Sequence, residues 1–124
     1  MKLNGLQHIG IPTEDFTASK KFYESLGFTL INQEKNCMSN VGFFNLNGTV
    51  IEIWEDASSG IKDAIDHIAL DTDDIELAYQ TVKQLGYPLI NEKIENLPFW
   101  EQGILYFNFL GPNNEIIEIS ERIR

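Results

Sequence analysis

The chain is poor in the residues that build several common kinds of site and segment. It has one cysteine, Cys37, among 124 residues, which excludes an internal disulfide bond and a cysteine-based zinc site. No apolar run approaches the roughly 20 residues of a membrane-spanning helix. The first residues also lack the apolar stretch of a secretion signal. We therefore expect a cytoplasmic protein with no membrane partner.

Positive charge is scarce as well. Nine Lys and Arg residues stand against 19 Asp and Glu, which gives a net charge of −10 and a pI of about 4.5. Such a surface repels the phosphates of nucleic acids and the headgroups of anionic lipids, so a nucleic-acid partner is not expected. The only arginines are Arg122 and Arg124. A substrate with several carboxylates or phosphates would therefore lack its usual arginine clamp.

What the chain does have is an internal duplication. Residues 8–32 and 67–91 match at an offset of 59, with nine of 25 positions identical. Residues 50–53 and 116–119 match at an offset of 66, which predicts an insertion in between, at 94–103. We therefore expect one domain over residues 1–124, built from two modules at about 5–55 and 64–120.

Each copy predicts the same series of elements: a strand, a helix and three more strands. Thr13 to Asp15 offer a cap for the first helix, Gly27 is suited to its end, and Asn47-Gly48 is a strong hairpin signal. In the first copy we expect strands at 6–11, 28–33, 41–46 and 49–55, around a helix that ends near Leu26. In the second copy we expect strands at 64–70, 88–91, 104–110 and 115–120, and a helix at 74–85. Residues 56–62 are expected to form an exposed connector. The pattern predicts an α+β fold of two tandem βαβββ modules.

Four residues of ligand type occupy matching places in the two copies. The only histidines, His8 and His67, correspond to each other, and so do Glu52 and Glu118. Strand alternation puts each of them on a face with apolar or small residues. One such residue alone would more often be structural, but four that respect a duplication favour a joint role. Two imidazoles and two carboxylates suit Ni²⁺, Co²⁺, Zn²⁺, Mn²⁺ or Fe²⁺ and leave positions for substrate oxygens. We therefore expect one divalent metal per site.

The sequence around these residues resembles the vicinal oxygen chelate superfamily, also called the glyoxalase/bleomycin resistance/dioxygenase group. The matching motifs are His8-Ile-Gly-Ile, Leu26-Gly-Phe, Val50-Ile-Glu-Ile, His67-Ile-Ala-Leu and the segment from Gly111 to Ile119. The resemblance implies two βαβββ modules that form a cupped mixed sheet around a divalent metal. It also implies a small-molecule substrate and a homodimer. The ligands come from one chain or from two, since both arrangements occur in the family.

The ligand order His, Glu, His, Glu is similar to that of metal-dependent glyoxalase I, the lactoylglutathione lyase type. This implies a lyase or isomerase that acts through an enediolate on a small carbonyl or hemithioacetal substrate, with a low-molecular-weight thiol as co-substrate. Glu118 would be the general base, and Glu52 would share the proton transfer. The alternatives are a non-catalytic binding or resistance protein of the same fold and an epimerase of an acyl thioester.

Two further points concern the substrate. The glutathione enzymes of the family have an arginine shortly after the first histidine, where this chain has Ile9 to Pro12. We therefore expect weak use of glutathione. Trp54, on the strand face of Glu52, is a candidate pocket wall, and Phe99 and Trp100 in the expected insertion are candidates for a lid or a dimer contact. The aromatic pair Phe22-Tyr23 is expected in the core.

Overall fold

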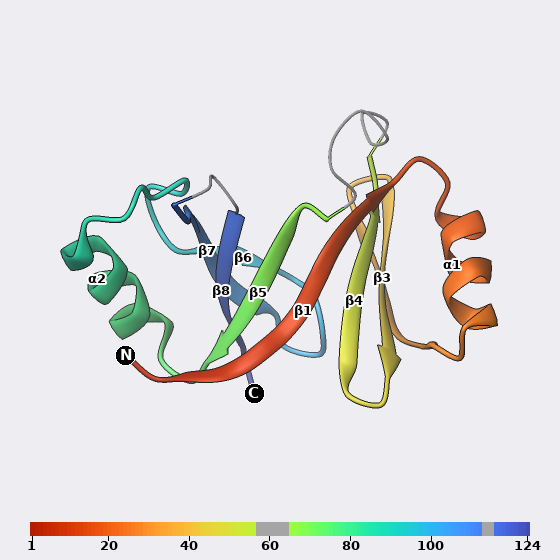
Figure 1. Ribbon diagram of the computed structural model, residues 1–124, viewed down its shortest axis with the longest axis horizontal. Coiled ribbons are helices and arrows are strands. Elements are labelled where there is room, and N and C mark those ends of the chain that lie inside the picture. Colours follow the sequence, from red (N-terminus) through yellow and green to blue (C-terminus); the bar gives the residue numbers. More distant parts are fainter. Residues whose placement is uncertain (57–64, 113–115) are drawn as a thin grey trace. The chain divides into compact units, whose positions relative to one another are not determined.

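The computed structural model describes residues 1–56, 65–112 and 116–124. They form two compact units (Figure 1). The N-terminal unit is His8–Asp66, and the C-terminal unit combines Met1–Gln7 with His67–Arg124. Within the described residues, no helix has the length and apolar character to cross a membrane. The expected connector at 56–62 falls mostly outside these residues.

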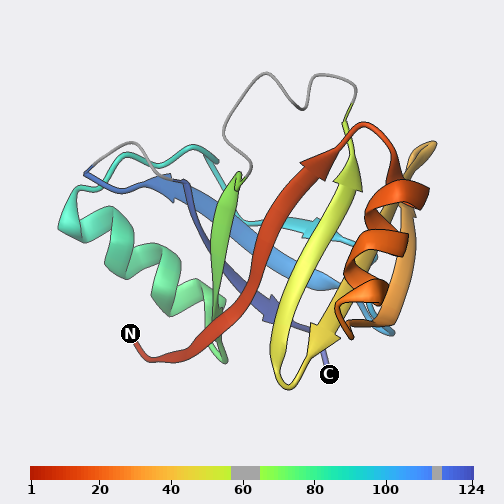
Figure 2. The ribbon, with the colours of Figure 1, turned by 45° about the vertical axis from the view of Figure 1, so that its right-hand side comes forward.

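The described residues of the N-terminal unit form one helix and four strands. They are β1 (Leu3–Thr13), which begins in the C-terminal unit, α1 (Phe16–Ser25), β2 (Thr29–Asn36), β3 (Ser39–Leu46) and β4 (Thr49–Glu55). The strands lie in the order β2-β3-β4-β1, with β4 parallel to β1 and the other pairs antiparallel. Helix α1 packs on one face of this sheet (Figure 2).

Local sequence signals explain where these elements begin and end. The Asp15 side chain accepts a hydrogen bond of 3.0 Å from the backbone N–H of Ala18 and so caps α1. Gly27, just past the helix, has a φ of 101°, a conformation that side chains disfavour. Asn47 and Gly48 both have positive φ, 50° and 93°, which is the requirement of the tight hairpin between β3 and β4. All three signals were read correctly from the sequence.

The C-terminal unit repeats the pattern. Its elements are β5 (His67–Thr72), α2 (Ile75–Leu85), β6 (Glu95–Leu97), β7 (Ile104–Leu110) and β8 (Ile116–Arg122). The strands lie in the order β5-β8-β7-β6, with β5 parallel to β8 and the other pairs antiparallel. Asp74 caps α2 by accepting from Leu77, and Gly86 ends it with a φ of 80°. The α+β class and the two βαβββ modules are confirmed.

One predicted strand is wrong. Residues 88–91 form only an isolated bridge, between Leu89 and Phe109. Pro88 has no N–H to donate, and the Asn91 side chain accepts from the backbone N–H of Asn108 at 2.6 Å. Two backbone hydrogen bonds flank the bridge, from Ile90 to Asn108 at 2.9 Å and from Leu110 to Pro88 at 3.0 Å, and the Asn91 side chain ends the backbone ladder there. The outer strand of this unit is β6 instead, which lies inside the expected insertion.

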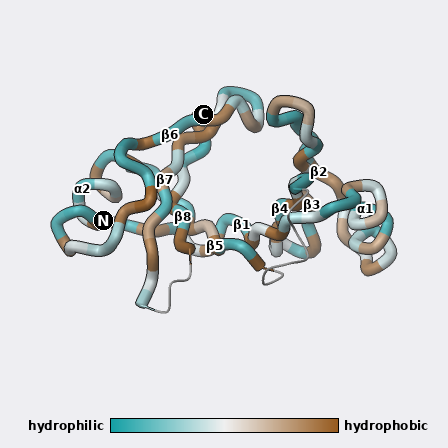
Figure 3. Tube along the Cα trace, turned by 90° about the horizontal axis from the view of Figure 1, so that it is seen from above, coloured by the Kyte–Doolittle hydropathy of each residue, from teal (hydrophilic) through white to brown (hydrophobic). Residues whose placement is uncertain are grey.

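Both helices carry hydrophilic as well as hydrophobic residues (Figure 3). In α1, Phe16 is buried and Tyr23 packs against the core cluster. Phe22 is 57% exposed, so its expected place in the core is wrong. Positions 22 and 23 are adjacent on a helix and therefore face about 100° apart, so only one of the two rings can reach the sheet.

In the two hydrophobic cores, large and small side chains exchange places between equivalent strand and helix positions. A Cβ added at Gly42 of β3 would lie 2.8 Å from the Phe16 ring and 2.9 Å from the Phe44 ring. Gly42 pairs with Ile53, and in the C-terminal unit Phe107 pairs with the corresponding Ile119. There the helix position of Phe16 is taken by the smaller Ile75. The N-terminal unit thus combines a glycine on the strand with a large ring on the helix. The C-terminal unit combines a phenylalanine on the strand with a smaller side chain on the helix.

This packing predicts the effect of a single methyl group. Gly42→Ala should lower the free energy of unfolding by about 1–3 kcal/mol, because the new Cβ overlaps two buried rings. The double variant with Phe16→Leu should recover part of that loss. Thr49→Ala, at an exposed end of β4, should stay within about 0.5 kcal/mol of the wild type. Urea unfolding measures all three, and an unchanged midpoint for Gly42→Ala would contradict the packing account.

Candidate metal centre

The N-terminal unit holds one buried histidine and one carboxylate side by side. His8 on β1 and Glu52 on β4 come from adjacent parallel strands, with Gly10 in register opposite Glu52. The His8 Nε2 lies 3.3 Å from the Glu52 Oε1. His8 is 2% exposed and the Glu52 side chain 13%. The rings of Phe43 and His8 form a T-shaped pair with a centroid distance of 5.6 Å, so the imidazole has an apolar neighbour.

The C-terminal unit holds the equivalent pair. His67 on β5 and Glu118 on β8 again come from adjacent parallel strands, with Ala69 in register opposite Glu118. The His67 Nε2 lies 3.4 Å from the Glu118 Oε2. His67 is 9% exposed and the Glu118 side chain 13%. Gly10 and Ala69 each stand two residues after the histidine and beside the glutamate. Their small size leaves room for the carboxylate.

The spacing within each pair fits ligands of one ion. The N–O distances of 3.3 and 3.4 Å exceed the roughly 2.7–2.9 Å of a tight charge-assisted hydrogen bond. Bonds of about 2.0–2.2 Å from an ion to a nitrogen and an oxygen, at angles of about 90–110°, place the two ligands about 3.0–3.5 Å apart. Burial removes water from the carboxylate at a cost in free energy. A bound cation compensates that cost, so the buried position favours an ion. Each pair therefore fits half of an N₂O₂ site for a divalent metal.

The remaining predicted residues have different surroundings. Trp54 is half-buried on β4 and alternates onto the strand face of Glu52. Phe99 is buried, with 3% exposure. Trp100 is half-buried and has a φ of 65°, unusual for a bulky residue. Contact of any of the three with a substrate stays a prediction.

Two residues that the sequence does not mark as site residues share a strand face with Glu118. Ser120 and Arg122 follow it at alternate positions of β8. Ser120 is fully buried, and its hydroxyl has no hydrogen-bond partner in the described part of the chain. The Arg122 guanidinium lies 3.9 Å above the Trp100 ring. The period-2 spacing of 118, 120 and 122 could have revealed them.

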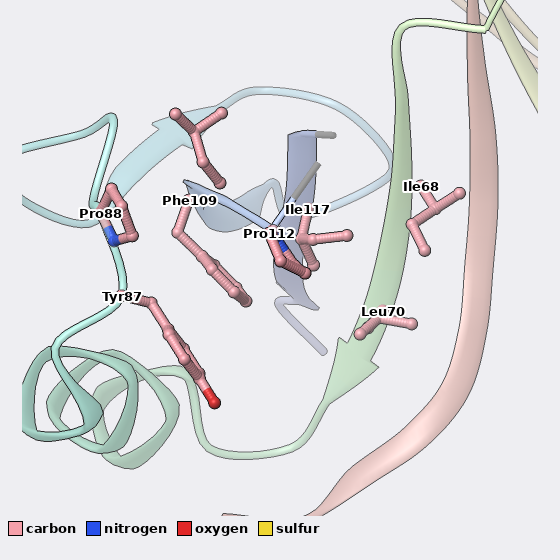
Figure 4. Close-up of a pocket in the computed structure, with 9 residues that line it drawn as sticks. Ile68, Leu70, Tyr87, Pro88, Phe109, Pro112 and Ile117 are labelled. Carbon is pink, nitrogen blue, oxygen red and sulfur yellow. The ribbon is translucent and has the colours of Figure 1, made fainter. Parts of the chain in front are cut away.

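The opposite face of the same sheet carries an apolar pocket of about 800 Å³. Ile68 and Ile117 line it and alternate with His67 and Glu118, so the pocket lies away from the His–Glu pair. Figure 4 shows the Tyr87 and Phe109 rings side by side, stacked at 6.0 Å and 10°. In the N-terminal unit, Phe28 stands at the position of Tyr87 and packs on Tyr23, where the C-terminal unit has Val82. Within the described residues, the pocket lining offers no His, Cys, Asp or Glu side chain, so this pocket is distinct from the candidate metal centre.

Comparison with known proteins places the chain in a family. The model of the Glyoxalase/Bleomycin resistance protein/Dioxygenase superfamily matches residues 5–119. The uncharacterized protein YwbC of Bacillus subtilis (strain 168) is 34% identical over 125 residues, which cover 94% of this chain and 97% of YwbC.

Solved structures share the fold at lower identity. Methylmalonyl-CoA epimerase from Mycobacterium tuberculosis superposes with a TM-score of 0.78 at 21% identity, over 98% of this chain and 90% of that one. The Mn(II)-bound glyoxalase from Novosphingobium aromaticivorans gives a TM-score of 0.65 at 20% identity, over 97% of this chain and 39% of that one. The family model, which matches most of the chain, shows that the chain belongs to the Glyoxalase/Bleomycin resistance protein/Dioxygenase superfamily.

Proposed function

We propose that the protein is a divalent-metal-dependent lyase or isomerase of the glyoxalase I kind, acting on a small carbonyl or hemithioacetal substrate. The observation that carries the proposal is the pair of buried His–Glu contacts, at 3.3 and 3.4 Å, in equivalent places of the two units. A superfamily that counts glyoxalases among its members adds support. The ligand set would be His8, Glu52, His67 and Glu118 around one ion.

The chemistry divides between the ion and the carboxylates. When bound, the ion would act as a Lewis acid and stabilise the negative charge that develops on the substrate oxygens. Glu118 would take the proton from the carbon next to the carbonyl, and Glu52 would return a proton to the neighbouring carbon. These two proton transfers would pass through an enediolate intermediate. Both glutamate side chains are 13% exposed, so few waters compete for the transferred proton.

The charge of the protein bears on which thiol serves as co-substrate. A hemithioacetal forms from a small aldehyde and a low-molecular-weight thiol, and only its carbonyl-derived end has to reach the ligands. A glutathione adduct carries two carboxylates into a protein with a net charge of −10 and two arginines. We therefore propose that a thiol with fewer negative charges is preferred.

An epimerase of an acyl thioester is the second candidate. An epimerase needs one base on each side of the reacting carbon. Glu52 and Glu118 have equal exposure and equivalent histidine partners, which suits such a two-base reaction. Both candidates begin with proton removal next to a carbonyl, and the stereochemistry of the product in D₂O distinguishes them. An inverted centre with one deuterium indicates epimerisation, and a rearranged carbonyl indicates glyoxalase chemistry.

Metal binding is the first prediction of this proposal. The purified protein, stripped and reloaded with Ni²⁺, Co²⁺, Zn²⁺ or Mn²⁺, should hold one ion per chain by elemental analysis. His67→Ala should weaken binding by at least about 100-fold, since even residues that only support metal ligands are worth 10–100-fold. Glu76→Gln, an exposed carboxylate at the start of α2, serves as the matched control. Full stoichiometry and affinity in His67→Ala would place the metal elsewhere.

Removing the proposed base should separate binding from catalysis. Glu118→Gln keeps an oxygen ligand but cannot take a proton, so kcat should fall by about 10²–10⁴-fold while the loaded protein still holds metal. Steady-state assays with methylglyoxal and several thiols, glutathione among them, provide the measurement. An unchanged rate would remove Glu118 from the chemistry. Glutathione-dependent kcat/KM above about 10⁵ M⁻¹s⁻¹ would contradict the charge argument.

Homodimer formation is the third prediction. Each unit leaves an outer strand, β2 or β6, with one side unpaired in its own sheet, and such edges favour association. Sedimentation equilibrium should give about twice the 14.2 kDa of the chain. A monomer at high micromolar concentration would contradict it.

A further inference from the structure

The positively charged side chain of Arg122 stacks on an aromatic ring. Its guanidinium lies 3.9 Å above the centre of the Trp100 ring, at a half-buried site near the end of β8. Although the chain has 19 acidic residues, Arg122 makes no ion pair within the part that the structure describes. A guanidinium that stacks on an aromatic face keeps its N–H donors free around its edge.

Arg122 also points to the same side of the sheet as Glu118. The register across β7 and β8 pairs Asn108 with Glu118, Tyr106 with Ser120 and Ile104 with Arg122. The next strand, β6, adds Leu97 beside Ile104. Arg122 therefore lies in an apolar row, whereas the His67–Glu118 pair lies about 13 Å away, four residues along the strand. An apolar row strengthens the attraction of a cation for an anion, because it lowers the local dielectric constant.

Ser120 provides an independent indication of a ligand. It lies between Glu118 and Arg122 on this face, is fully buried, and has no hydrogen-bond partner for its hydroxyl in the described residues. The neighbouring Asp71, in register with Ser120 on β5, already accepts from the amides of Asn4 and Gln7 at 2.8 and 3.1 Å. A buried hydroxyl without a partner is costly, and such a group commonly meets a water or a ligand.

The Trp100 backbone shows that this arrangement is held by its surroundings. Its φ of 65° is disfavoured for a bulky residue, and the cost is offset by packing. Gly103 accepts a hydrogen bond of 2.9 Å from the backbone N–H of Ile123, directly after Arg122. The segment that carries Trp100 is thus tied to the end of β8, beside Arg122.

We infer that Ser120 and Arg122 form the tail subsite of the substrate, with Trp100 positioning the guanidinium. The substrate class is a molecule with vicinal oxygens at one end, a hydrogen-bonding group in the middle and a single carboxylate or phosphate at the far end. The binding of the substrate's vicinal oxygens rests on the proposed function. The binding of its anionic end rests on Arg122. It narrows the co-substrate to a thiol or acyl group with one anionic charge, since the second arginine, Arg124, is exposed.

A pair of probes tests the subsite without turnover. The hydroxamate of N-succinyl-β-alanine has two chelating oxygens, a central amide and a terminal carboxylate, and its methyl ester lacks only the charge. Calorimetric titration of the Ni²⁺-loaded protein should show the carboxylate binding about 10- to 100-fold tighter than the ester, the range of a hydrogen bond to a charged group. A third probe with a terminal phosphate distinguishes the two kinds of anion.

Substitutions assign the preference to one residue. Arg122→Gln should abolish the difference between acid and ester, and Arg122→Lys should keep part of it, because lysine retains charge without the planar fork. Arg124→Gln removes an identical charge two residues away and should leave the difference within about threefold. Ser120→Ala should unfold at the same temperature as the wild type or higher, since it removes an unpartnered hydroxyl, and should weaken both probes.

The outcomes separate this inference from the proposed function. Equal loss in Arg122→Gln and Arg124→Gln, or no preference for the acid, would overturn the subsite. A marked drop in the unfolding temperature of Ser120→Ala would overturn the role of the Ser120 hydroxyl in the subsite. The metal-free protein should still prefer the acid over the ester, with weaker binding overall. If the acid is preferred but Ni²⁺ does not tighten either probe, the subsite stands and the metal-dependent function fails.

Discussion

The burial of an imidazole next to a carboxylate, once in each unit, is the constraint on which the rest of the site depends. A buried carboxylate is expensive unless a cation, a proton or a metal compensates it. Both histidines lie below 10% exposure, and both glutamate contacts are longer than a strong hydrogen bond. The strands around them are built to hold these groups, with Gly10 and Ala69 leaving space beside each carboxylate. The proposed metal binding and proton transfer both follow from that pairing.

Duplication explains why one design appears twice and where the copies have diverged. The histidines, glutamates, helix caps and terminal glycines are kept at equivalent positions. The cores differ through exchanged volumes, with Gly42 under Phe16 in one unit and Phe107 under Ile75 in the other. The functional face differs as well, because only the C-terminal unit carries Arg122 and Trp100. The symmetric part therefore suits metal binding, and the asymmetric part suits selection of a substrate.

The elements that the sequence predicted are those governed by neighbouring residues. Asp15 and Asp74 cap their helices, Gly27 and Gly86 end them, and Asn47-Gly48 turns the first hairpin. These signals act over a few residues and are therefore legible without a structure. The four candidate ligands were also visible, because the duplication marks them.

Features that depend on long-range packing were not legible in the same way. The strand expected at 88–91 is replaced by an isolated bridge, because the Asn91 side chain takes the N–H of Asn108, 17 residues away. Phe22 looks like a core residue by composition, yet Tyr23 reaches the core cluster and Phe22 is exposed. The stack of Arg122 on Trp100 joins residues 22 positions apart through a left-handed backbone that no local pattern indicates.

The central claim is that the two His–Glu pairs serve one ion, and proton NMR of the Co²⁺-loaded protein tests it most directly. The chain has only two histidines, and the Nε2 atom of each faces its glutamate, so each coordinated ring should show one strongly shifted, exchangeable Nδ1–H signal. The account predicts that both signals grow together during the titration and stop growing at one Co²⁺ per chain. A single shifted signal, or two signals that appear one after the other and saturate at two ions per chain, would contradict it.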